Sequence, residues 1–382
     1  MRSRTRYPIA PSWAEVDLAA VRHNLRAVRE LLGPNCGVWA VVKTNAYGHG
    51  LVETARAAVE GGAAGLAVAT FSEGAQLRRT GITHPVLLLC AGDPRRARET
   101  VRFDLIQTMC RTDVARALSR ASQALGKPAR AHLKVDTGMG RLGLSPEEAA
   151  PFARALLDLP GLRLEGVFSH LASAEAEDPS YTRLQLDRFR AVVDSLRAAG
   201  IDPGICHLAN SAAALRFPET RLGGVRAGLL TYGILPDAPA LAHIDLRPAL
   251  TWRTRLAFVG RLRPGSRVSY GGTYLVGHEG LTGVLPLGYA DGYPRHASNR
   301  AYALVTGMRC PVVGKVCMDH TILDLASLGE ARVGEEVVLV GRQGDERITA
   351  NDVARWSGGV VHEVTTLIGN RVARLYRNRA AD

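Results

Sequence analysis

Lys43 is the residue whose type and setting most clearly suggest chemistry. It ends an apolar run and opens the segment Lys43-Thr44-Asn45-Ala46-Tyr47-Gly48-His49-Gly50. Only four of the 48 basic residues are lysines: Lys43, Lys127, Lys134 and Lys315. Arginine serves wherever positive charge alone is needed, but a guanidinium cannot act as an amine nucleophile or base. Lys43 is therefore a candidate to form a Schiff base with a carbonyl cofactor such as pyridoxal phosphate and later to carry a proton, with a solvated lysine at a strand end as the alternative.

Length and composition indicate a globular protein of more than one domain. The 382 residues suggest two or three domains, or one large barrel with a smaller partner domain. A hydrophobic content of 46% with 22% charged residues fits this class, and no apolar run is long enough to cross a bilayer. The first dozen residues contain no apolar core of a secretory signal, so we expect a cytoplasmic protein with no membrane partner.

Charge, cysteine and histidine patterns argue against nucleic-acid and metal binding. The net charge is +12, but the arginines are spread along the chain among acidic residues, so we expect no nucleic-acid partner. Attraction of small anionic substrates, or an arginine-rich genome, explains the charge equally well. The six cysteines form no C-x-x-C pair and the eleven histidines no H-x-x-x-H pattern, so we expect free thiols and no metal site.

Eight short apolar runs alternate with helix-like segments and predict an α/β fold. Eight strand–helix units in about 220 residues fit a (β/α)8 TIM barrel, with a doubly wound open sheet as the alternative. Polar residues such as Lys43, Asp136 and His170 directly follow the runs, and in a barrel such positions meet at one mouth, which favours the barrel. The runs are 37–42, 65–69, 86–89, 105–109, 131–135, 164–168, 205–208 and 224–226.

The pattern changes after about residue 247, where short β-like runs are separated by glycines. Only 351–356 has the pattern of a short helix in this part. We therefore predict a barrel domain over 12–245 and a mostly β C-terminal domain over 246–382, with residues 1–11 as a candidate addition to the second domain.

Several motifs in the right order resemble the alanine racemases, which depend on pyridoxal phosphate and have fold type III. The match begins at the lysine segment and spans almost the whole chain, so it is far more specific than any single motif. The matching segments are Val41 to Gly50, Lys134 to Arg141, His207 to Ser211, Val268 to Gly271, Gly288 to Gly292 and Val316 to Asp319.

The resemblance implies an isomerase that interconverts L-alanine and D-alanine by a two-base mechanism. Lys43 would serve one face of the substrate, and Tyr270 of the partner subunit the other. A homodimer with shared active sites is therefore implied. The physiological role would be either D-alanine biosynthesis for the cell wall or D-alanine breakdown.

The resemblance also assigns residues around the cofactor. Arg226 would face the pyridine nitrogen, and because a guanidinium does not readily give up a proton, that nitrogen would stay unprotonated. His170 would neighbour Arg226 and Tyr270 as part of a hydrogen-bonded relay. The remaining cofactor-binding residues implied are Tyr47, Asn210, Ser211, Gly228, Leu229 and Asn370, with a helix cap as the alternative role of the segment that begins at Asn210.

A further group is implied around the substrate. Arg141 would meet the substrate carboxylate, and Lys134 stands where many family members carry a carbamylated lysine that orients this arginine. Met318 and Asp319 would line the pocket across the dimer. Tyr289 would lie at the entrance and Arg295 behind the active-site arginine.

Asn370 departs from the pattern, because some alanine racemases carry a tyrosine at this position. A smaller polar residue would leave room for a serine hydroxyl, and apolar pockets reject an added hydroxyl by only about 10²-fold. A serine or broad-specificity racemase is thus the first alternative. Less favoured alternatives are a decarboxylase that uses the same cofactor and a non-catalytic protein that binds pyridoxal phosphate.

Overall fold

The structure, a computed structural model, describes residues 10–379. It divides into two compact units. The barrel unit comprises Ala19–Ala46 and Leu51–Arg247, and the C-terminal unit comprises the chain up to Leu18, the short segment Tyr47–Gly50 and the chain from Pro248 onward. Each unit has its own sheet and is described separately.

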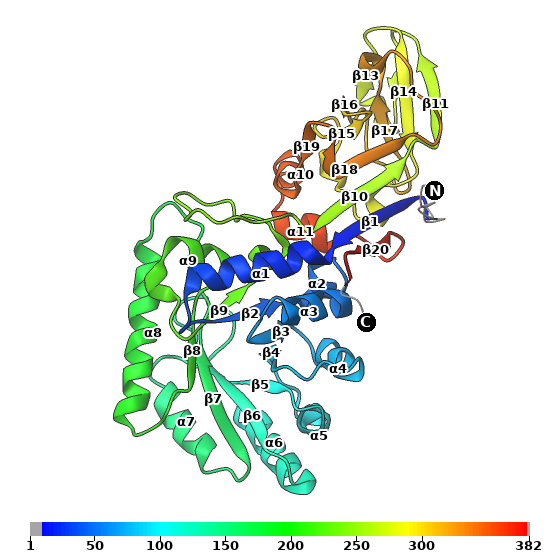
Figure 1. The fold of residues 1–382 in the computed structure, drawn as a ribbon. Coiled ribbons are helices and arrows are strands. Elements are labelled where there is room, and N and C mark those ends of the chain that lie inside the picture. Colours follow the sequence, from blue (N-terminus) through cyan, green and yellow to red (C-terminus); the bar gives the residue numbers. More distant parts are fainter. Residues whose placement is uncertain (1–9, 380–382) are drawn as a thin grey trace. The chain divides into compact units, whose positions relative to one another are not determined.

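Eight parallel strands close into a barrel, which confirms the predicted fold (Figure 1). Closure is completed by β2 and β9, which pair in parallel from Gly37 opposite Gly224 to Ala40 opposite Ala227. Each strand falls within or beside one of the eight apolar runs. The strands are β2 (Gly37–Val41), β3 (Gly65–Val68), β4 (Val86–Ala91), β5 (Ile106–Met109), β6 (Ala129–Lys134), β7 (Leu162–Phe168), β8 (Ile205–His207) and β9 (Gly224–Ala227).

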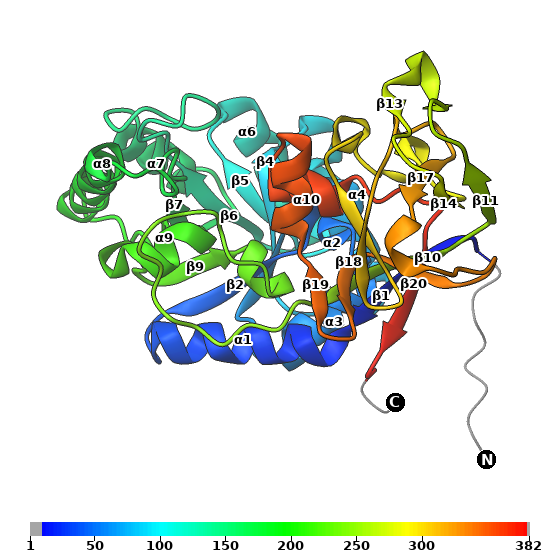
Figure 2. The same cartoon turned by 90° about the horizontal axis from the view of Figure 1, so that it is seen from above.

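Helices surround the barrel strands, as the view from above shows for α1, α6, α7 and α8 (Figure 2). Local sequence sets several of their ends. Thr70 and Glu73 form a capping box at the start of α4, and Gly126 ends α6 in the left-handed conformation with a φ of 62°. The helices are α1 (Leu18–Leu32), α2 (Lys43–Tyr47), α3 (Leu51–Glu60), α4 (Phe71–Arg79), α5 (Ala97–Arg102), α6 (Thr112–Leu125), α7 (Ala149–Leu157), α8 (Ser180–Ala198) and α9 (Ser211–Arg216).

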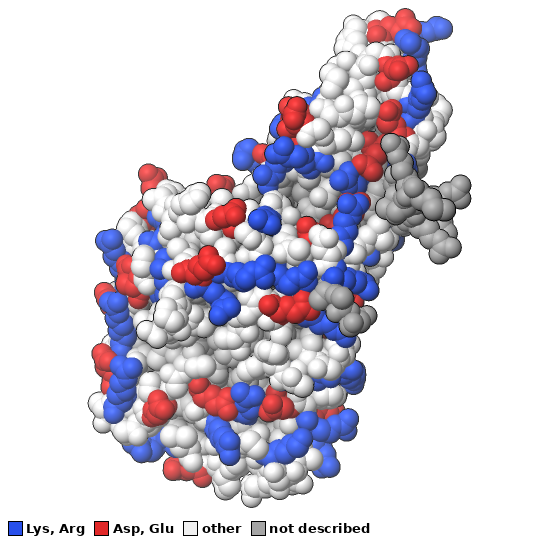
Figure 3. Space-filling model, viewed as in Figure 1, with Lys and Arg blue, Asp and Glu red and all other residues white. Residues whose placement is uncertain are grey.

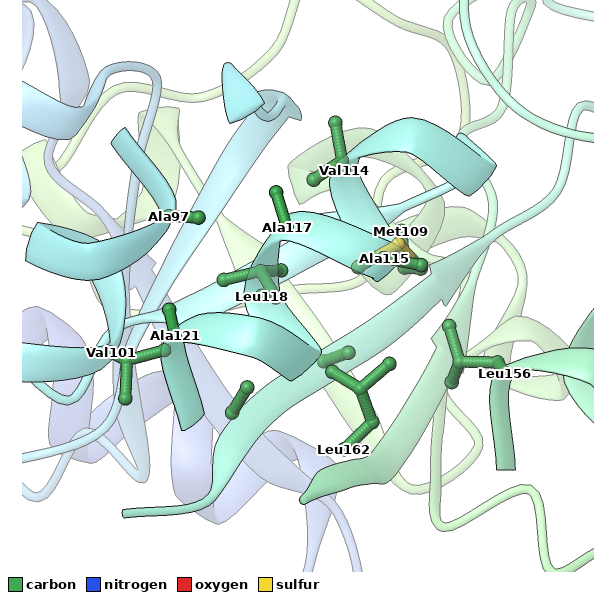
Figure 4. Packing of buried hydrophobic residues seen from close by; sticks show 12 residues of the cluster. Ala97, Val101, Met109, Val114, Ala115, Ala117, Leu118, Ala121, Leu156 and Leu162 are labelled. Atoms are coloured by element: carbon green, nitrogen blue, oxygen red, sulfur yellow. The ribbon is translucent and has the colours of Figure 1, made fainter. Parts of the chain in front are cut away.

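One apolar cluster joins α5, α6 and α7 to the strands that they cover (Figure 4). Met109 at the end of β5 and Leu118 on α6 are almost fully buried in it, together with Leu156 of α7. Burial of a side chain of this size contributes about 1.5–3 kcal/mol. Packing of this kind fixes the strands, and therefore the polar residues at their ends.

The C-terminal unit is mostly β, as predicted, but within the described residues the part after residue 247 contains two α-helices rather than one. The helices are α10 (Ala350–Ser357), which covers the predicted segment, and α11 (Val361–Thr366). A seven-stranded sheet contains β1 (Ser12–Asp17), β10 (Leu250–Arg255), β15 (Tyr302–Val305), β16 (Met308–Pro311), β18 (Glu336–Gln343), β19 (Glu346–Ile348) and β20 (Ala373–Arg377). Smaller sheets contain β11 (Phe258–Leu262), β14 (Gly280–Leu285) and β17 (Thr321–Asp324), and β12 (Arg267–Val268) with β13 (Tyr274–Leu275).

The two units differ from the predicted division at the N-terminal side. Strand β1, which we placed in the barrel domain, pairs antiparallel with β10 and parallel with β20 and thus belongs to the C-terminal unit. Of the segment 1–11, residues 1–9 lie outside the described residues.

Part of the lysine motif also belongs to the C-terminal unit. Gly48 has a φ of 83°, and a Cβ placed there would overlap the carbonyl oxygen of Thr365. A Cβ on Gly50, with a φ of 98°, would overlap the hydroxyl of Tyr376. Arg374 donates from Nε to the carbonyl of Gly48 at 3.0 Å. These two glycines of the motif therefore permit close packing as well as left-handed backbone.

Charged side chains of both signs are interspersed on the face seen in Figure 3. Along residues 10–379, none of the helices combines the length and apolar character that crossing a membrane requires.

Candidate active site

The barrel brings the predicted polar residues to the carboxyl ends of its strands. Lys43 follows β2, Lys134 ends β6, His170 follows β7, Ser211 follows β8, and Arg226 lies in β9. Because all eight strands are parallel and the barrel is closed, these positions share one mouth.

Lys43 is held on an unusual backbone turn. The four residues after it, Thr44 to Tyr47, have φ values between 51° and 54°, which is the left-handed helical region. Glu73 accepts a hydrogen bond from the Thr44 amide at 2.6 Å, and Asn45 accepts one from the Leu51 amide at 2.9 Å. A strained turn held by side chains on both sides presents the lysine in a defined place.

The pKa of Lys43 is lowered, first by burial and then by the charge of Arg141. Cys90 and Glu73 oppose this effect. A larger share of the amine is therefore unprotonated near neutral pH than for an exposed lysine, as a nucleophile or base requires.

Arg226 is enclosed by acceptors. Its Nη1 donates to Nδ1 of His207 at 2.8 Å and to the carbonyl of the same residue at 3.0 Å. Its Nη2 contacts the carbonyls of Ser169 and Leu208 at 2.6 and 3.1 Å, and Nδ1 of His170 at 3.2 Å. Burial, helped by Arg141, lowers the pKa of Arg226 to about 9. The guanidinium thus stays charged at neutral pH while its orientation is fixed.

Two further histidines form a chain behind Arg226. Nδ1 of His132 lies 2.9 Å from Nε2 of His207. Because a guanidinium can only donate, Nδ1 of His207 accepts and its proton sits on Nε2, which donates to His132. Burial lowers the pKa of His132 to about 3 and that of His207 well below its ordinary value. Phe168 stacks on the His207 ring at 4.8 Å. The two hydrogen-bonded histidines therefore support Arg226 without adding charge.

Asp136 organises the loop that leads to Arg141. One carboxylate oxygen accepts the amides of Gly138, Met139 and Gly140 at 2.7 to 3.1 Å, and the other accepts the Arg141 amide at 2.9 Å. Burial alone would raise the pKa of Asp136, but these four hydrogen bonds lower it to about 2. The ionised carboxylate thus fixes the backbone that carries Arg141.

Lys134 is a buried amine with few partners of opposite charge. The residue is only 4% exposed. Its Nζ donates to the carbonyl of Val135 at 3.0 Å and lies 5.1 Å from the centre of the Phe168 ring. Burial and the charge of Arg226 lower its pKa to about 7. More of this amine is therefore neutral near pH 7 than in an exposed lysine, and a neutral amine can react with an electrophile.

Ser211 and the start of the helix after β9 form a polar group of their own. The Ser211 hydroxyl accepts the amides of Gly228 at 3.0 Å and Leu230 at 3.4 Å, which leaves its proton free to be donated. Leu229 begins the short helix Leu229–Tyr232, so its amide has no acceptor within that helix. Asn210 caps α9 by accepting the Ala213 amide at 2.9 Å, as the alternative prediction of a helix cap implies.

The C-terminal unit gathers most of the other predicted residues around the segment 315–319. Ser269, next to Tyr270, donates from its hydroxyl to the Lys315 carbonyl at 2.6 Å. The amides of Tyr289 and Ala290 donate to the carbonyls of Cys317 and Met318 at 3.0 and 3.1 Å. Tyr270 and Met318 are 69% and 53% exposed, respectively. Their side chains therefore present an accessible surface on this unit.

Asp319 pairs with Arg371, the residue that follows Asn370, in the C-terminal unit. Asp319 forms an ion pair of 2.8 Å with Arg371, and that arginine also lies 3.2 Å from Asp291. Asn370 is exposed in the turn that precedes β20.

Tyr289 and Arg295 line a hollow of about 520 Å³.

Tyr47 lies in the part of the lysine motif that belongs to the C-terminal unit. It is buried, and burial raises its pKa to about 12. Its hydroxyl therefore stays protonated and can donate a hydrogen bond at neutral pH.

Sequence reasoning did not assign a supporting role to several residues that hold this arrangement, including Asp136, which it placed at the mouth. His207 lies inside a quoted motif and could have been assigned from it. Asp136 lies in another, where its spacing before the glycines suits a backbone cap. Glu73 belongs to the capping box at the start of α4, a pattern that gives no sign of its hydrogen bond to the Thr44 amide. His132 and Gln185 lie in segments without a recognisable motif, and only the closed barrel shows what they contact.

Comparison with known proteins gives matches along the whole chain. The family model for the alanine racemase N-terminal domain matches residues 16–236, and that for the alanine racemase C-terminal domain matches 249–376. The alanine racemases of Halothermothrix orenii and Symbiobacterium thermophilum are 41% and 46% identical, and each alignment covers 97% of this chain, with 97% and 98% of the relative. A crystal structure of alanine racemase from a D-cycloserine-producing Streptomyces lavendulae superimposes with a TM-score of 0.91 at 39% identity, covering 97% of this chain and 98% of that one.

Proposed function

The chain belongs to the alanine racemase family of isomerases, and on that basis we propose that it interconverts L-alanine and D-alanine with pyridoxal phosphate by a two-base mechanism. The observation that carries the proposal is the arrangement at the barrel mouth. There a lysine with a lowered pKa shares the strand ends with an arginine whose orientation is fixed by neutral histidines.

The donor groups at the mouth fit this cofactor. The Ser211 hydroxyl and the amides near Gly228 and Leu229 are suited to a phosphate, with the Tyr47 hydroxyl as a further donor assigned by resemblance. The amine of Lys43 suits an aldehyde. When bound, pyridoxal phosphate would withdraw negative charge from the α-carbon of the substrate.

Lys43 would take or return the α-proton on one face. Its lowered pKa leaves more of the amine unprotonated than in an exposed lysine, which favours acceptance of a proton from carbon once that proton is acidified. Arg226 would offer the pyridine nitrogen a hydrogen bond while keeping its own protons, because its pKa of about 9 still exceeds neutral pH. Limited withdrawal of charge would favour return of the proton to the α-carbon over side reactions.

Tyr270 of the partner subunit would serve the opposite face in a homodimer. Its exposure of 69% supports this role, because a catalytic phenol open to solvent in one chain needs a second surface to enclose it. Met318, Asp319 and Tyr289, grouped beside it, would complete the substrate pocket in the same way.

Arg141 would bind the substrate carboxylate, with Lys134 behind it. The four hydrogen bonds of Asp136 support a fixed loop for this arginine. The neutral fraction of Lys134 supports carbamylation, since only an unprotonated amine adds carbon dioxide. The carbamate would supply an anion to orient the Arg141 guanidinium.

Loss of optical rotation from L-alanine in deuterated water tests the proposal. With purified protein and pyridoxal phosphate, we expect racemisation together with deuterium at the α-carbon. L-Serine run alongside should react more slowly, because the similar relatives are alanine racemases. Bound cofactor with unchanged rotation would contradict the proposal and favour a non-catalytic binding protein, and release of carbon dioxide would favour a decarboxylase.

A further inference from the structure

We propose that Gln185, a buried residue of α8, positions the two loops that carry Arg141 and His170. The inference rests on the proposed function for its catalytic consequence, and on contacts within the barrel unit for its structural one. Gln185 has 0% exposed surface. It therefore acts through the groups that it holds and would not touch the substrate.

The Gln185 amide is fully engaged with the two loops. Its Oε1 accepts the amide of Ala172 at 2.8 Å, and its Nε2 donates to the carbonyl of His170 at 3.1 Å and to the hydroxyl of Thr137 at 3.4 Å. The backbone N–H of Ala172 can only donate, and the backbone carbonyl of His170 can only accept. These partners therefore fix the positions of Oε1 and Nε2 in the Gln185 side chain. One side chain thus joins the loop after β6 to the loop after β7.

The neighbouring residues of α8 hold the first loop at adjacent points. The hydroxyl of Tyr181 donates to the carbonyl of Gly138 at 2.7 Å, and Arg188 donates to the carbonyl of Thr137 at 3.1 Å. Asp136 then gathers the amides from Gly138 to Arg141, as described above. The helix therefore fixes the start of the loop, and Asp136 carries that constraint on to Arg141.

A series of hydrogen bonds connects Gln185 to Arg226 through the loop after β7. Thr137 shares a hydrogen bond of 2.8 Å with Ser169, and both hydroxyls are buried. The Ser169 carbonyl accepts Nη2 of Arg226 at 2.6 Å, and the same nitrogen contacts His170. Gln185 is accordingly the point at which the supports of Arg141 and of Arg226 with His170 meet.

Replacing Gln185 with an apolar residue of similar length would remove the hydrogen-bond partner of the Ala172 amide and of the His170 carbonyl, both of which are partly buried. Such groups regain partners by moving toward water, which displaces the loops. Displacement of about 1 Å near a reacting centre lowers rates by up to about 10²-fold. Gln185→Met should therefore retain the fold and lose positional accuracy.

The catalytic test compares Gln185→Met with Thr182→Val in the full-length holoenzyme. Thr182 lies on the same helix, is equally buried, and has a hydroxyl for which the described residues supply no hydrogen-bond partner. For Gln185→Met we expect kcat/KM for alanine to fall by about tenfold to a hundredfold, mainly through KM, while cofactor absorbance is retained. Thr182→Val should match the wild type. An unchanged kcat/KM in Gln185→Met would overturn the proposal.

Hydrogen exchange of the cofactor-free chain supplies a readout that is independent of activity. Peptides covering 137–141 and 170–172 should exchange faster in Gln185→Met than in the wild type, with β2 to β5 unchanged. Thr137→Val removes one partner of Gln185 together with the hydrogen bond to Ser169. It should speed exchange of the same peptides to a smaller extent, and it serves as the test if Gln185→Met does not fold. Faster exchange throughout the barrel would indicate general destabilisation and count against positioning. If the wild type fails to racemise alanine, the proposed function falls, and the exchange pattern still decides the role of Gln185.

Discussion

Arg226 donates to Nδ1 of His207 across 2.8 Å, and this bond leaves the His207 ring a single proton on its other nitrogen. That nitrogen already faces Nδ1 of His132 at 2.9 Å. Protonating either histidine would place a second donor against an existing donor in a buried site. The pair is therefore stable only while both rings are neutral.

We predict that this pair makes folding sensitive to acid. An unfolded histidine takes up a proton near pH 6.5, whereas the pKa of His132 in the fold is about 3 and that of His207 is also well below its ordinary value. The unfolded state therefore binds more protons below pH 6.5, and stability is lost as the pH falls from there toward the folded pKa values. When the pH falls from 7.5 to 5.5, each histidine should lower the free energy of unfolding by about 1.4 kcal/mol.

Urea unfolding at the two pH values measures this loss. His132→Gln should show a smaller loss than the wild type, because its amide cannot titrate. His278→Gln, which replaces an exposed histidine, should behave like the wild type. Equal pH dependence in all three proteins would contradict the assignment.

Tyr270→Phe should abolish most racemisation while leaving the cofactor bound. The variant keeps the ring but removes the proton that the proposed mechanism requires on the opposite face, and general acid–base groups contribute about 10²- to 10⁴-fold. Steady-state rates in both directions, with absorbance of the bound cofactor, provide the measurement. Tyr302→Phe, at a residue of the same unit that is 38% exposed, is the matched control and should keep its activity. A Tyr270→Phe enzyme with nearly normal turnover would remove the phenol from the mechanism.

The buried amine of Lys134 should take up carbon dioxide, because burial lowers its pKa to about 7. After incubation with carbon-13 bicarbonate at pH 8, we expect a carbamate resonance in the wild type and none in Lys134→Arg. Lys127→Arg alters an exposed lysine and should retain the resonance. Activity should fall in Lys134→Arg alone. Retention of the signal in Lys134→Arg would place the modification elsewhere.

Gly48→Ala should destabilise the protein by more than about 4 kcal/mol, since it combines left-handed backbone with overlap of the Thr365 carbonyl. Gly126→Ala separates the two effects, because Gly126 is also left-handed, with a φ of 62°, but has no atom within 4 Å of the added methyl group. The left-handed backbone alone should cost about 1–2 kcal/mol. Thermal unfolding measures both variants. Similar melting temperatures would show that the Thr365 segment yields to the methyl group.

The barrel could be predicted from sequence because its strands are buried on both sides and appear as apolar runs bounded by turn residues. Lys43 and Arg226 could be placed at the mouth because each directly ends or follows such a run. The pairing of β1 with β10 and β20 could not, since an N-terminal strand carries no local mark of partners about 240 and about 360 residues away. The role of Gln185 could not be predicted for a related reason. A glutamine on an amphipathic helix is usually solvated, and only the contacts of the closed barrel show that both loops depend on it.

The four residues Tyr47–Gly50 are encoded early in the gene but belong by their contacts to the C-terminal unit. The two units are therefore not modules that a single genetic crossover could exchange. A junction between residues 247 and 248 would supply a foreign α11 and β20 while retaining the native Gly48 and Gly50, whose neighbours Thr365 and Tyr376 would then come from another parent. Chimaeras of this family should tolerate such an exchange only when those neighbours are inherited together with the lysine segment.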